Sequence, residues 1–331
     1  MTDSTLLSSR RRNDWRSAVS QVLRSTQVNL GTVGSGRHTD PVRALSRWDR
    51  APTQACPEGV AWARLDELEL VDRHRAGRKP MTVIATTLAH LDEGQIRVDL
   101  AAAFRLAAKM DLHESVANHF SAAVSPDGTR FLMNPKWRHF GLVRASELLL
   151  LDADDPSTMD RSDAPDASAW CIHGAIHAHI PTARAVLHCH PPYATAMCGL
   201  ADPTIPPIDQ ATARFWGRTV YDMEMGGPPD DPAEGARVAE ALVDNTVMLM
   251  GNHGVTVIGE TVAHAFEELY YLERACRNVI LALSSGRPLR IMDDALADSV
   301  ARMWSRYSDQ GVAHFAEQKA LLDRDDLSYR D

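Results

Sequence analysis

Three short apolar runs constrain the fold of this chain more than any other feature of its sequence. Residues 184–190, 246–250 and 255–258 are rich in β-branched and aliphatic side chains, and proline, glycine or polar residues bound each run. Runs of this kind are typical of strands buried in a sheet. Residues 261–284 carry apolar side chains at three- and four-residue spacing, which predicts a long amphipathic helix. The alternation indicates an α/β fold with one central sheet.

The rest of the chain divides into three parts. Residues 1–95 are broken by glycine and proline and are predicted to form an extension of short helices and loops, residues 96–286 the α/β domain, and residues 287–331 a helical tail. The other elements predicted are helices at 96–112, 169–180 and 233–243, strands at 121–124 and 131–133 around a tight turn, and a solvated loop at 152–166.

Composition excludes several classes of protein. The 331 residues include 44 acidic and 35 basic side chains, a net charge of −9, whereas binding along a nucleic-acid backbone needs clustered lysine and arginine. No window approaches the roughly 18 apolar residues of a membrane span, and residues 1–20 lack the apolar stretch of a secretory signal. The five cysteines are scattered, which predicts free thiols in a cytoplasmic protein. Together these features predict that the protein binds neither nucleic acid nor membrane.

Three histidines follow the predicted strands. His188 and His190 are two residues apart at a strand end, so their side chains are expected on one face of the sheet. His253 comes just after another strand, and its neighbours Gly251 and Gly254 allow a close approach of the backbone. Three imidazoles can hold a divalent transition metal and leave one position open. The alternative is a set of core histidines satisfied by hydrogen bonds.

A rival set lies on the helix predicted at 169–180. His173 and His177 are separated by one helical turn and His179 is close by, a spacing that can also bind a metal. No glutamate follows His173 as a zinc-peptidase motif would require, so a helix that carries several histidines without a metal is the favoured interpretation. Cys189 points away from the histidines on either side of it and is expected in the core.

A series of ordered motifs between residues 100 and 283 resembles the class II aldolase/adducin family. They are Ala-Asn-His-Phe-Ser at 117–121, Phe-Leu-Met-Asn-Pro at 131–135, Arg-Ala-Ser-Glu-Leu at 144–148, His-Gly-Ala-Ile at 173–176, the run 185–196 around His-Cys-His-Pro-Pro-Tyr, Gly-Asn-His-Gly-Val at 251–255, and Ala-Phe to Leu-Glu at 265–273. The resemblance implies a three-layer α/β/α fold with a central mixed sheet. It also implies a homotetramer and one divalent metal on His188, His190 and His253, with zinc first and manganese, cobalt or iron as alternatives.

Two departures from the family pattern bear on the reaction and on the substrate. Sugar-phosphate aldolases of the family carry a glutamate near the start of the helix before the His-x-His strand, and alignment on Trp170 and His173 puts Ala169 there. They also cradle phosphate with small turns, where this chain has the bulkier Asn118-His119 and Pro135-Lys136-Trp137. The expected substrate is therefore a small carboxylic acid without a phosphate.

The remaining candidates concern substrate binding and catalysis. Asn118, Lys136, Arg138 and His139 are predicted to bind the substrate, with a solvated turn and a core Trp137 as the alternative. His119 is a candidate proton donor, since histidine titrates near neutral pH, although a structural hydrogen bond is an open alternative. Tyr193 is a second catalytic candidate, for which packing is the alternative.

These residues predict a metal-dependent carbon–carbon lyase. Its substrate would be a hydroxy- or oxo-acid without a phosphate. The reaction would be the non-oxidative decarboxylation of a hydroxylated carboxylate, aromatic or not, through a metal-stabilised enolate, and retro-aldol cleavage shares that intermediate. Some members of the family resemble iron-dependent oxygenases of aryl-pyruvate-type acids, which is the runner-up. A non-catalytic adducin-like binding module ranks last because adducins have lost the metal histidines, and all three are present here.

Overall fold

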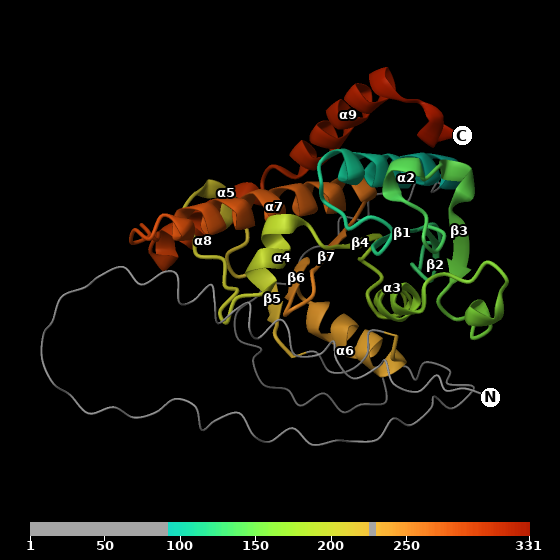
Figure 1. Cartoon of the computed structure of the whole chain (residues 1–331), viewed down its shortest axis with the longest axis horizontal. Helices are drawn as coiled ribbons and strands as arrows, with labels where there is room; N and C mark the ends of the chain where they lie inside the picture. Colours follow the sequence, from blue (N-terminus) through green and yellow to red (C-terminus); the bar gives the residue numbers. More distant parts are fainter. Residues whose placement is uncertain (1–91, 225–229) are drawn as a thin grey trace, which may run out of the picture. The chain divides into compact units, whose positions relative to one another are not determined.

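A mixed sheet with helices on both faces forms the centre of the described chain, as expected of an α/β/α fold (Figure 1). The computed structural model describes residues 92–224 and 230–331. The extension predicted over residues 1–95 lies outside this part, except for its last residues, which begin the first helix. Within the described residues, no helix combines the length and the apolar character needed to cross a membrane. The four cysteines found there are free thiols.

Seven strands make up the sheet in the order β3-β2-β1-β4-β7-β6-β5. They are β1 (His119–Ala123), β2 (Arg130–Met133), β3 (Leu149–Asp152), β4 (Ala185–Cys189), β5 (Thr219–Asp222), β6 (Val247–Met250) and β7 (Val255–Gly259). Neighbouring strands are antiparallel except β5 and β6, which are parallel, so the sheet is mixed as expected. The predicted strands are all present, while β3 and β5 at the two edges were not predicted.

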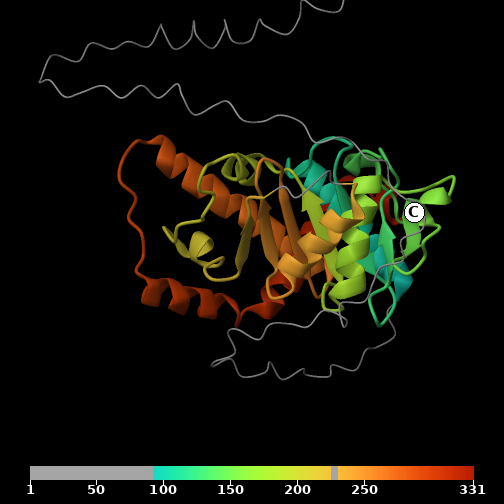
Figure 2. The ribbon, with the colours of Figure 1, turned by 90° about the horizontal axis from the view of Figure 1, so that it is seen from below.

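Two helix pairs sandwich the sheet. In Figures 1 and 2, α2 (Glu93–Lys109) and α7 (Val262–Ser284) lie on one face, and α3 (Ala167–His179) and α6 (Pro232–Leu242) on the other. Toward the C-terminal end of the chain, α9 (Ser308–Asp325) packs on α7. The remaining helices are α4 (Pro192–Cys198), α5 (Gln210–Ala213) and α8 (Asp294–Trp304), with short 3-10 helices η3 (Phe140–Leu142), η4 (Ala145–Glu147), η5 (Thr158–Asp160) and η6 (Ser328–Arg330).

Side-chain alternation along β4 decides which residues meet which helices. Leu187 and Cys189 are fully buried in the core beneath α2 and α7, so the expected core position of Cys189 is confirmed. Val186 packs in the opposite core, which α3 and α6 cover. Since side chains two residues apart share a face, His188 lies on the α3 side with Val186. Alternation thus places a histidine in the layer between the sheet and α3.

Capping residues explain where the helices begin. The Asp92 carboxylate accepts a hydrogen bond from the backbone N–H of Gly94 at 3.0 Å, so α2 starts at Glu93, before the predicted start at residue 96. The Asp166 carboxylate likewise accepts from the N–H of Ser168 at 3.0 Å, and α3 starts at Ala167. These caps fix the first turns of two helices that flank the site described next.

Candidate metal centre and adjoining cavity

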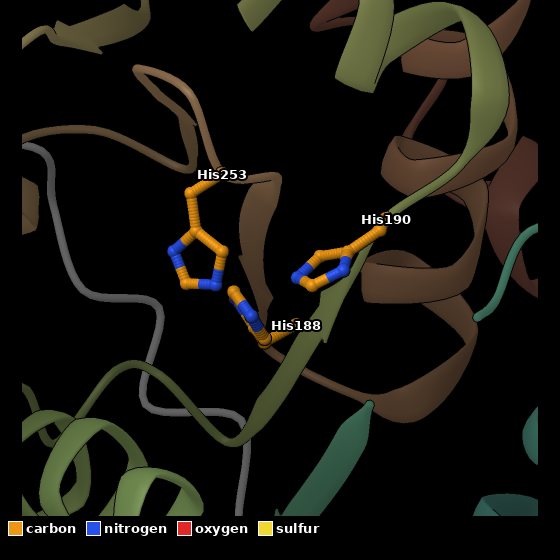
Figure 3. A group of neighbouring side chains, drawn as sticks. All are labelled: His188, His190 and His253. Carbon is orange, nitrogen blue, oxygen red and sulfur yellow. The ribbon is translucent and has the colours of Figure 1, made fainter. Parts of the chain in front are cut away.

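Three histidine side chains converge at the end of β4. His188 is in β4, His190 follows it directly, and His253 lies in the turn between β6 and β7. Figure 3 shows the three rings turned toward one another, and their ring nitrogens lie within 4.8 Å of one another. They are the one group of potential metal ligands found among the described residues. The structure therefore brings together the three residues predicted as metal ligands.

Hydrogen bonds on the outer ring nitrogens favour metal binding by two of these rings. Nδ1 of His190 donates to the Glu114 carboxylate at 2.5 Å, and Nδ1 of His188 lies 3.1 Å from the Thr256 hydroxyl. That hydroxyl donates to the Met250 sulfur at 3.5 Å, so it accepts from His188. A neutral imidazole that donates through Nδ1 keeps a lone pair on Nε2. Nε2 of His190 is buried and has no hydrogen-bond partner among the described residues, as a metal ligand requires.

The electrostatic surroundings of the cluster keep His188 and His253 neutral, which favours the binding of a cation. Burial lowers the pKa of the His188 ring well below its ordinary value, and the neighbouring histidines lower it further. Burial also lowers the pKa of His253. Both rings are therefore neutral near pH 7, the form in which imidazole binds a metal. The donor set suits a divalent transition metal with three protein ligands and an open position.

Gly254 permits this arrangement. A Cβ atom added there would collide with the His190 ring and would lie 2.7 Å from the carbonyl oxygen of Cys189. The expected close backbone approach beside His253 is confirmed at this glycine. A side chain at residue 254 would displace the ring of a candidate ligand.

The histidines of α3 belong to a separate group. His173 and His177 lie next to β1, where His173 contacts His119 and both α3 rings hydrogen-bond Ser121. Nδ1 of His179 lies 2.7 Å from the carbonyl oxygen of Ala175. The structure thus does not place the rival set together as metal ligands.

His119 connects this group with the metal centre and with a cavity. It pairs with His188 across β1 and β4, and the two rings stack with centroids 4.7 Å apart. It also lines a cavity of about 280 Å³. The other lining residues are Val116, Ala117, Asn118, Asn134, Lys136, Trp137, Asp166 and Ala169. The three candidate ligands do not line the cavity, so His119 is the residue that contacts the cluster and lines the cavity.

Polar and aromatic groups line this cavity. Nδ2 of Asn118 is a buried donor without a partner among the described residues. The Lys136 ammonium lies 4.7 Å from the centre of the Trp137 ring and 3.5 Å from the Asp166 carboxylate. Trp137 is 70% exposed and adopts a φ of 60°, so the alternative of a core tryptophan is wrong. Ala169 lines the cavity where sugar-phosphate aldolases carry a glutamate.

Three predicted site residues lie elsewhere. The Arg138 guanidinium forms two hydrogen bonds with Glu147, at 3.1 and 2.7 Å, and Nδ1 of His139 accepts from the N–H of Gly141. Tyr193 is the second residue of α4 and packs against the α2 and α7 core. None of the three lines the cavity, because each is engaged by its own local partner or by packing.

Two groups around the metal centre were missed in the sequence. Glu114 is far from the histidines along the chain, and Thr256 reaches His188 only through the pairing of β4 with β7. A carboxylate shortly before the Ala-Asn-His-Phe-Ser motif was the available signal for Glu114. No local pattern marks Thr256, because its contact depends on strand register.

Comparison with known proteins agrees with this architecture. The model of the class II aldolase and adducin N-terminal domain matches residues 98–280. A solved aldolase II superfamily protein from Pseudomonas syringae is 32% identical, with a TM-score of 0.65 over 72% of this chain and 96% of the other. A putative aldolase class 2 protein of Caulobacter vibrioides is 29% identical over 63% of this chain and 81% of its own length.

Two further relatives carry names that describe a reaction. The decarboxylase NovR of Streptomyces niveus is 26% identical over 58% of this chain and 69% of its own length. A 4-hydroxy-3-prenylphenylpyruvate oxygenase/4-hydroxy-3-prenylbenzoate synthase of Streptomyces roseochromogenus is 27% identical over 52% and 62%. The matched domain spans more than half of the chain, from within α2 through the three clustered histidines to α7. The chain belongs to the class II aldolase and adducin family.

Proposed function

We propose that this protein is a divalent-metal-dependent carbon–carbon lyase that decarboxylates a hydroxy- or oxo-acid without a phosphate, with an aromatic acid as the preferred class. The observation that carries the proposal is the His188, His190 and His253 cluster next to a cavity with an unpaired amide donor, since the His119 ring both stacks on His188 and lines that cavity. A bound cation would polarise a substrate oxygen and stabilise the enolate left when the carbon–carbon bond breaks.

The cavity supplies groups that would hold the acid. Nδ2 of Asn118 can donate to a substrate oxygen, since it is buried and otherwise unpaired. Lys136 offers a single positive charge, which suits a carboxylate and is shared with Asp166 at 3.5 Å. The Trp137 ring beside it offers an aromatic face to a planar substrate. One lysine and bulky neighbours favour a carboxylate over a phosphate.

His119 is proposed to act at the reacting end of the substrate. Burial lowers the pKa of its ring well below the ordinary value, so near pH 7 the ring is neutral. A neutral imidazole donates a hydrogen bond to an oxygen that gains negative charge during bond cleavage. The departing carboxyl group leaves as carbon dioxide, its bonding electrons remain on the substrate as the enolate, and the enolate carbon then takes a proton from water.

Elemental analysis and turnover together test the proposal. Protein purified without chelators is expected to hold about one divalent metal per chain. It is also expected to release carbon dioxide without oxygen from a hydroxylated aromatic acid or a 3-oxo acid, since loss of carbon dioxide from either leaves an enolate. His188→Ala and His253→Ala are expected to lose metal, whereas the control His179→Ala retains it. Full metal content in either ligand variant would contradict the site, and release of an aldehyde instead would support retro-aldol cleavage.

An iron-dependent oxygenase is the second candidate. The relative named as a prenylphenylpyruvate oxygenase favours it, since the two chains match over 174 residues. This function needs redox-active iron and dioxygen, whereas the lyase works with zinc, manganese or cobalt. Iron content with strictly oxygen-dependent turnover would establish the oxygenase and overturn the lyase. The predicted homotetramer and cytoplasmic location belong to the same proposal, and light scattering and cell fractionation test them.

A further inference from the structure

A continuous line of hydrogen bonds leads from the cavity wall into the layer between the sheet and α3. Nδ1 of His119 lies 2.9 Å from Nε2 of His173, and Nδ1 of His173 lies 2.6 Å from the Ser121 hydroxyl. The same hydroxyl lies 2.7 Å from Nε2 of His177. All four side chains are buried, with at most 5% of any residue exposed. Ser121, His173 and His177 lie outside the cluster of candidate metal ligands and do not line the cavity.

The line is a product of two periodicities. His119 and Ser121 are two residues apart on β1, so they share the face that α3 covers. His173 and His177 are one turn apart on α3, so they lie on one side of the helix. The seryl hydroxyl meets both rings because it sits between them.

The number of available protons allows only two assignments of donors and acceptors along this line of hydrogen bonds. A neutral imidazole carries one N–H and one lone pair, and a hydroxyl carries one hydrogen. If Ser121 donates to His173, then His177 donates to Ser121 through Nε2, and His173 donates to Nδ1 of His119. If Ser121 donates to His177 instead, every donor reverses. The two arrangements differ at the ends, at Nε2 of His119 and Nδ1 of His177.

The surroundings of His177, at the inner end of the line, favour the first of these two arrangements. Nδ1 of His177 is buried without a hydrogen-bond partner among the described residues, and the ring stacks on Phe131 with centroids 4.3 Å apart. The second arrangement would put an N–H at this position, and buried N–H groups without an acceptor are rare because their desolvation is costly. The first arrangement leaves only a lone pair there. It also puts a proton on Nε2 of His119, the one ring nitrogen that His173 does not engage.

We propose that Ser121, His173 and His177 are positioning residues that lock His119 as the tautomer with its proton on Nε2. His119 lines the cavity and its other ring nitrogen is taken by His173, so the Nε2 proton is the one that the ring can offer to a bound molecule. With this single tautomer, His119 is a constant hydrogen-bond donor in the cavity. The group that binds against it is therefore a hydrogen-bond acceptor, such as a carboxylate or oxo oxygen. The use of this donor on a substrate rests on the proposed function, whereas the tautomer itself does not.

Neutron diffraction from crystals of the full chain locates the ring protons directly. The wild-type protein is expected to show the proton of His119 on Nε2 and that of His173 on Nε2. In Ser121→Ala the hydroxyl is lost, and we expect His119 to lose its single tautomer and show protons on both ring nitrogens at partial occupancy. Ser121→Thr keeps the hydroxyl and is expected to keep the wild-type pattern.

The outcomes separate this inference from the proposed function. A proton on Nδ1 of His119 in the wild type would overturn the lock, as would an unchanged tautomer in Ser121→Ala. The wild-type tautomer without any decarboxylase activity would refute the proposed function and leave the lock intact. If both hold, Ser121→Ala is expected to lower kcat by about tenfold or more, within the usual worth of one hydrogen-bonding catalytic group, and Ser121→Thr is expected to restore it.

Discussion

Glu114 is a single residue on which the orientation of a candidate ligand depends. Its carboxylate accepts a hydrogen bond from Nδ1 of His190 at 2.5 Å and so holds the opposite nitrogen toward the other two rings. Loss of such an outer partner typically weakens metal binding by about 10–100-fold. We expect this loss in Glu114→Ala, which removes the acceptor, measured by competition with a chromogenic chelator. The exposed Glu317→Ala is the control, and equal affinity in both variants would show that Glu114 does not orient the ligand.

Gly254 is the second residue with a specific role at this scale. A Cβ atom there collides with the His190 ring and approaches the carbonyl oxygen of Cys189 to 2.7 Å. Gly254→Ala is therefore expected to lose metal and about 1–3 kcal/mol of unfolding free energy, the usual cost of overpacking. Elemental analysis and urea unfolding measure the two effects. Gly199→Ala, where the new Cβ would lie at an ordinary 3.4 Å from Ala196, is expected to change neither.

At the scale of elements, the approach of α6 to α3 depends on a glycine. A Cβ atom on Gly235 would lie 2.7 Å from the carbonyl carbon of Cys171 and closer still to its oxygen, so the two helix backbones are in contact. Alanine favours a helix over glycine by about 1 kcal/mol. Gly235→Ala is nevertheless expected to destabilise the protein by about 1–3 kcal/mol, because the helices must separate. Urea unfolding measures this, and a stability gain would show that α3 and α6 separate without cost.

The elements also show how far the sequence could predict this fold. Strands β4, β6 and β7 are fully or mostly buried apolar runs, and α7 has a long apolar stripe, so local pattern was sufficient to predict them. Strand β5 lies at a sheet edge and is only half-buried, so its pattern is weak. Strand β3 at the other edge is a short run of leucines, which by itself does not distinguish a strand from a helix. Helix α4 depends on a distant group, since the Glu273 carboxylate of α7 accepts from the backbone N–H groups of Tyr193 and Ala194.

The candidate site follows the same division. The His-x-His spacing and the glycines around His253 were sufficient to predict the cluster, because each feature is local. Arg138 was predicted to bind substrate from its residue type, but its pairing with Glu147 depends on how the chain turns between β2 and β3. The hydrogen-bonded line through Ser121 required the packing of α3 on β1, which no single segment encodes.

At the scale of the whole molecule, the layer between the sheet and α3 holds several neutral histidines, and this makes stability depend on pH. Burial lowers the pKa of His177 to about 3, and it lowers the pKa of His119, His173 and His188 well below 6.5. In the unfolded chain each ring titrates near its ordinary value of about 6.5. Below that pH the unfolded state binds protons that the folded state excludes. The contribution of the buried neutral histidines to the free energy of unfolding is therefore complete above about pH 6.5 and is lost as the pH falls toward 3.

The expected result is a steep loss of unfolding free energy between pH 7 and pH 5, above the range in which most carboxylates titrate. Each buried histidine adds a slope of about 1.4 kcal/mol per pH unit once the unfolded ring is protonated. Urea unfolding at half-unit steps of pH measures this slope, with a chelator present so that metal release does not add to it. His177→Gln removes one titrating ring and is expected to reduce the slope by about one proton. A free energy of unfolding that does not change with pH over this range would show that the buried rings take up protons in the folded state. The histidines between the sheet and α3 would then not be held neutral.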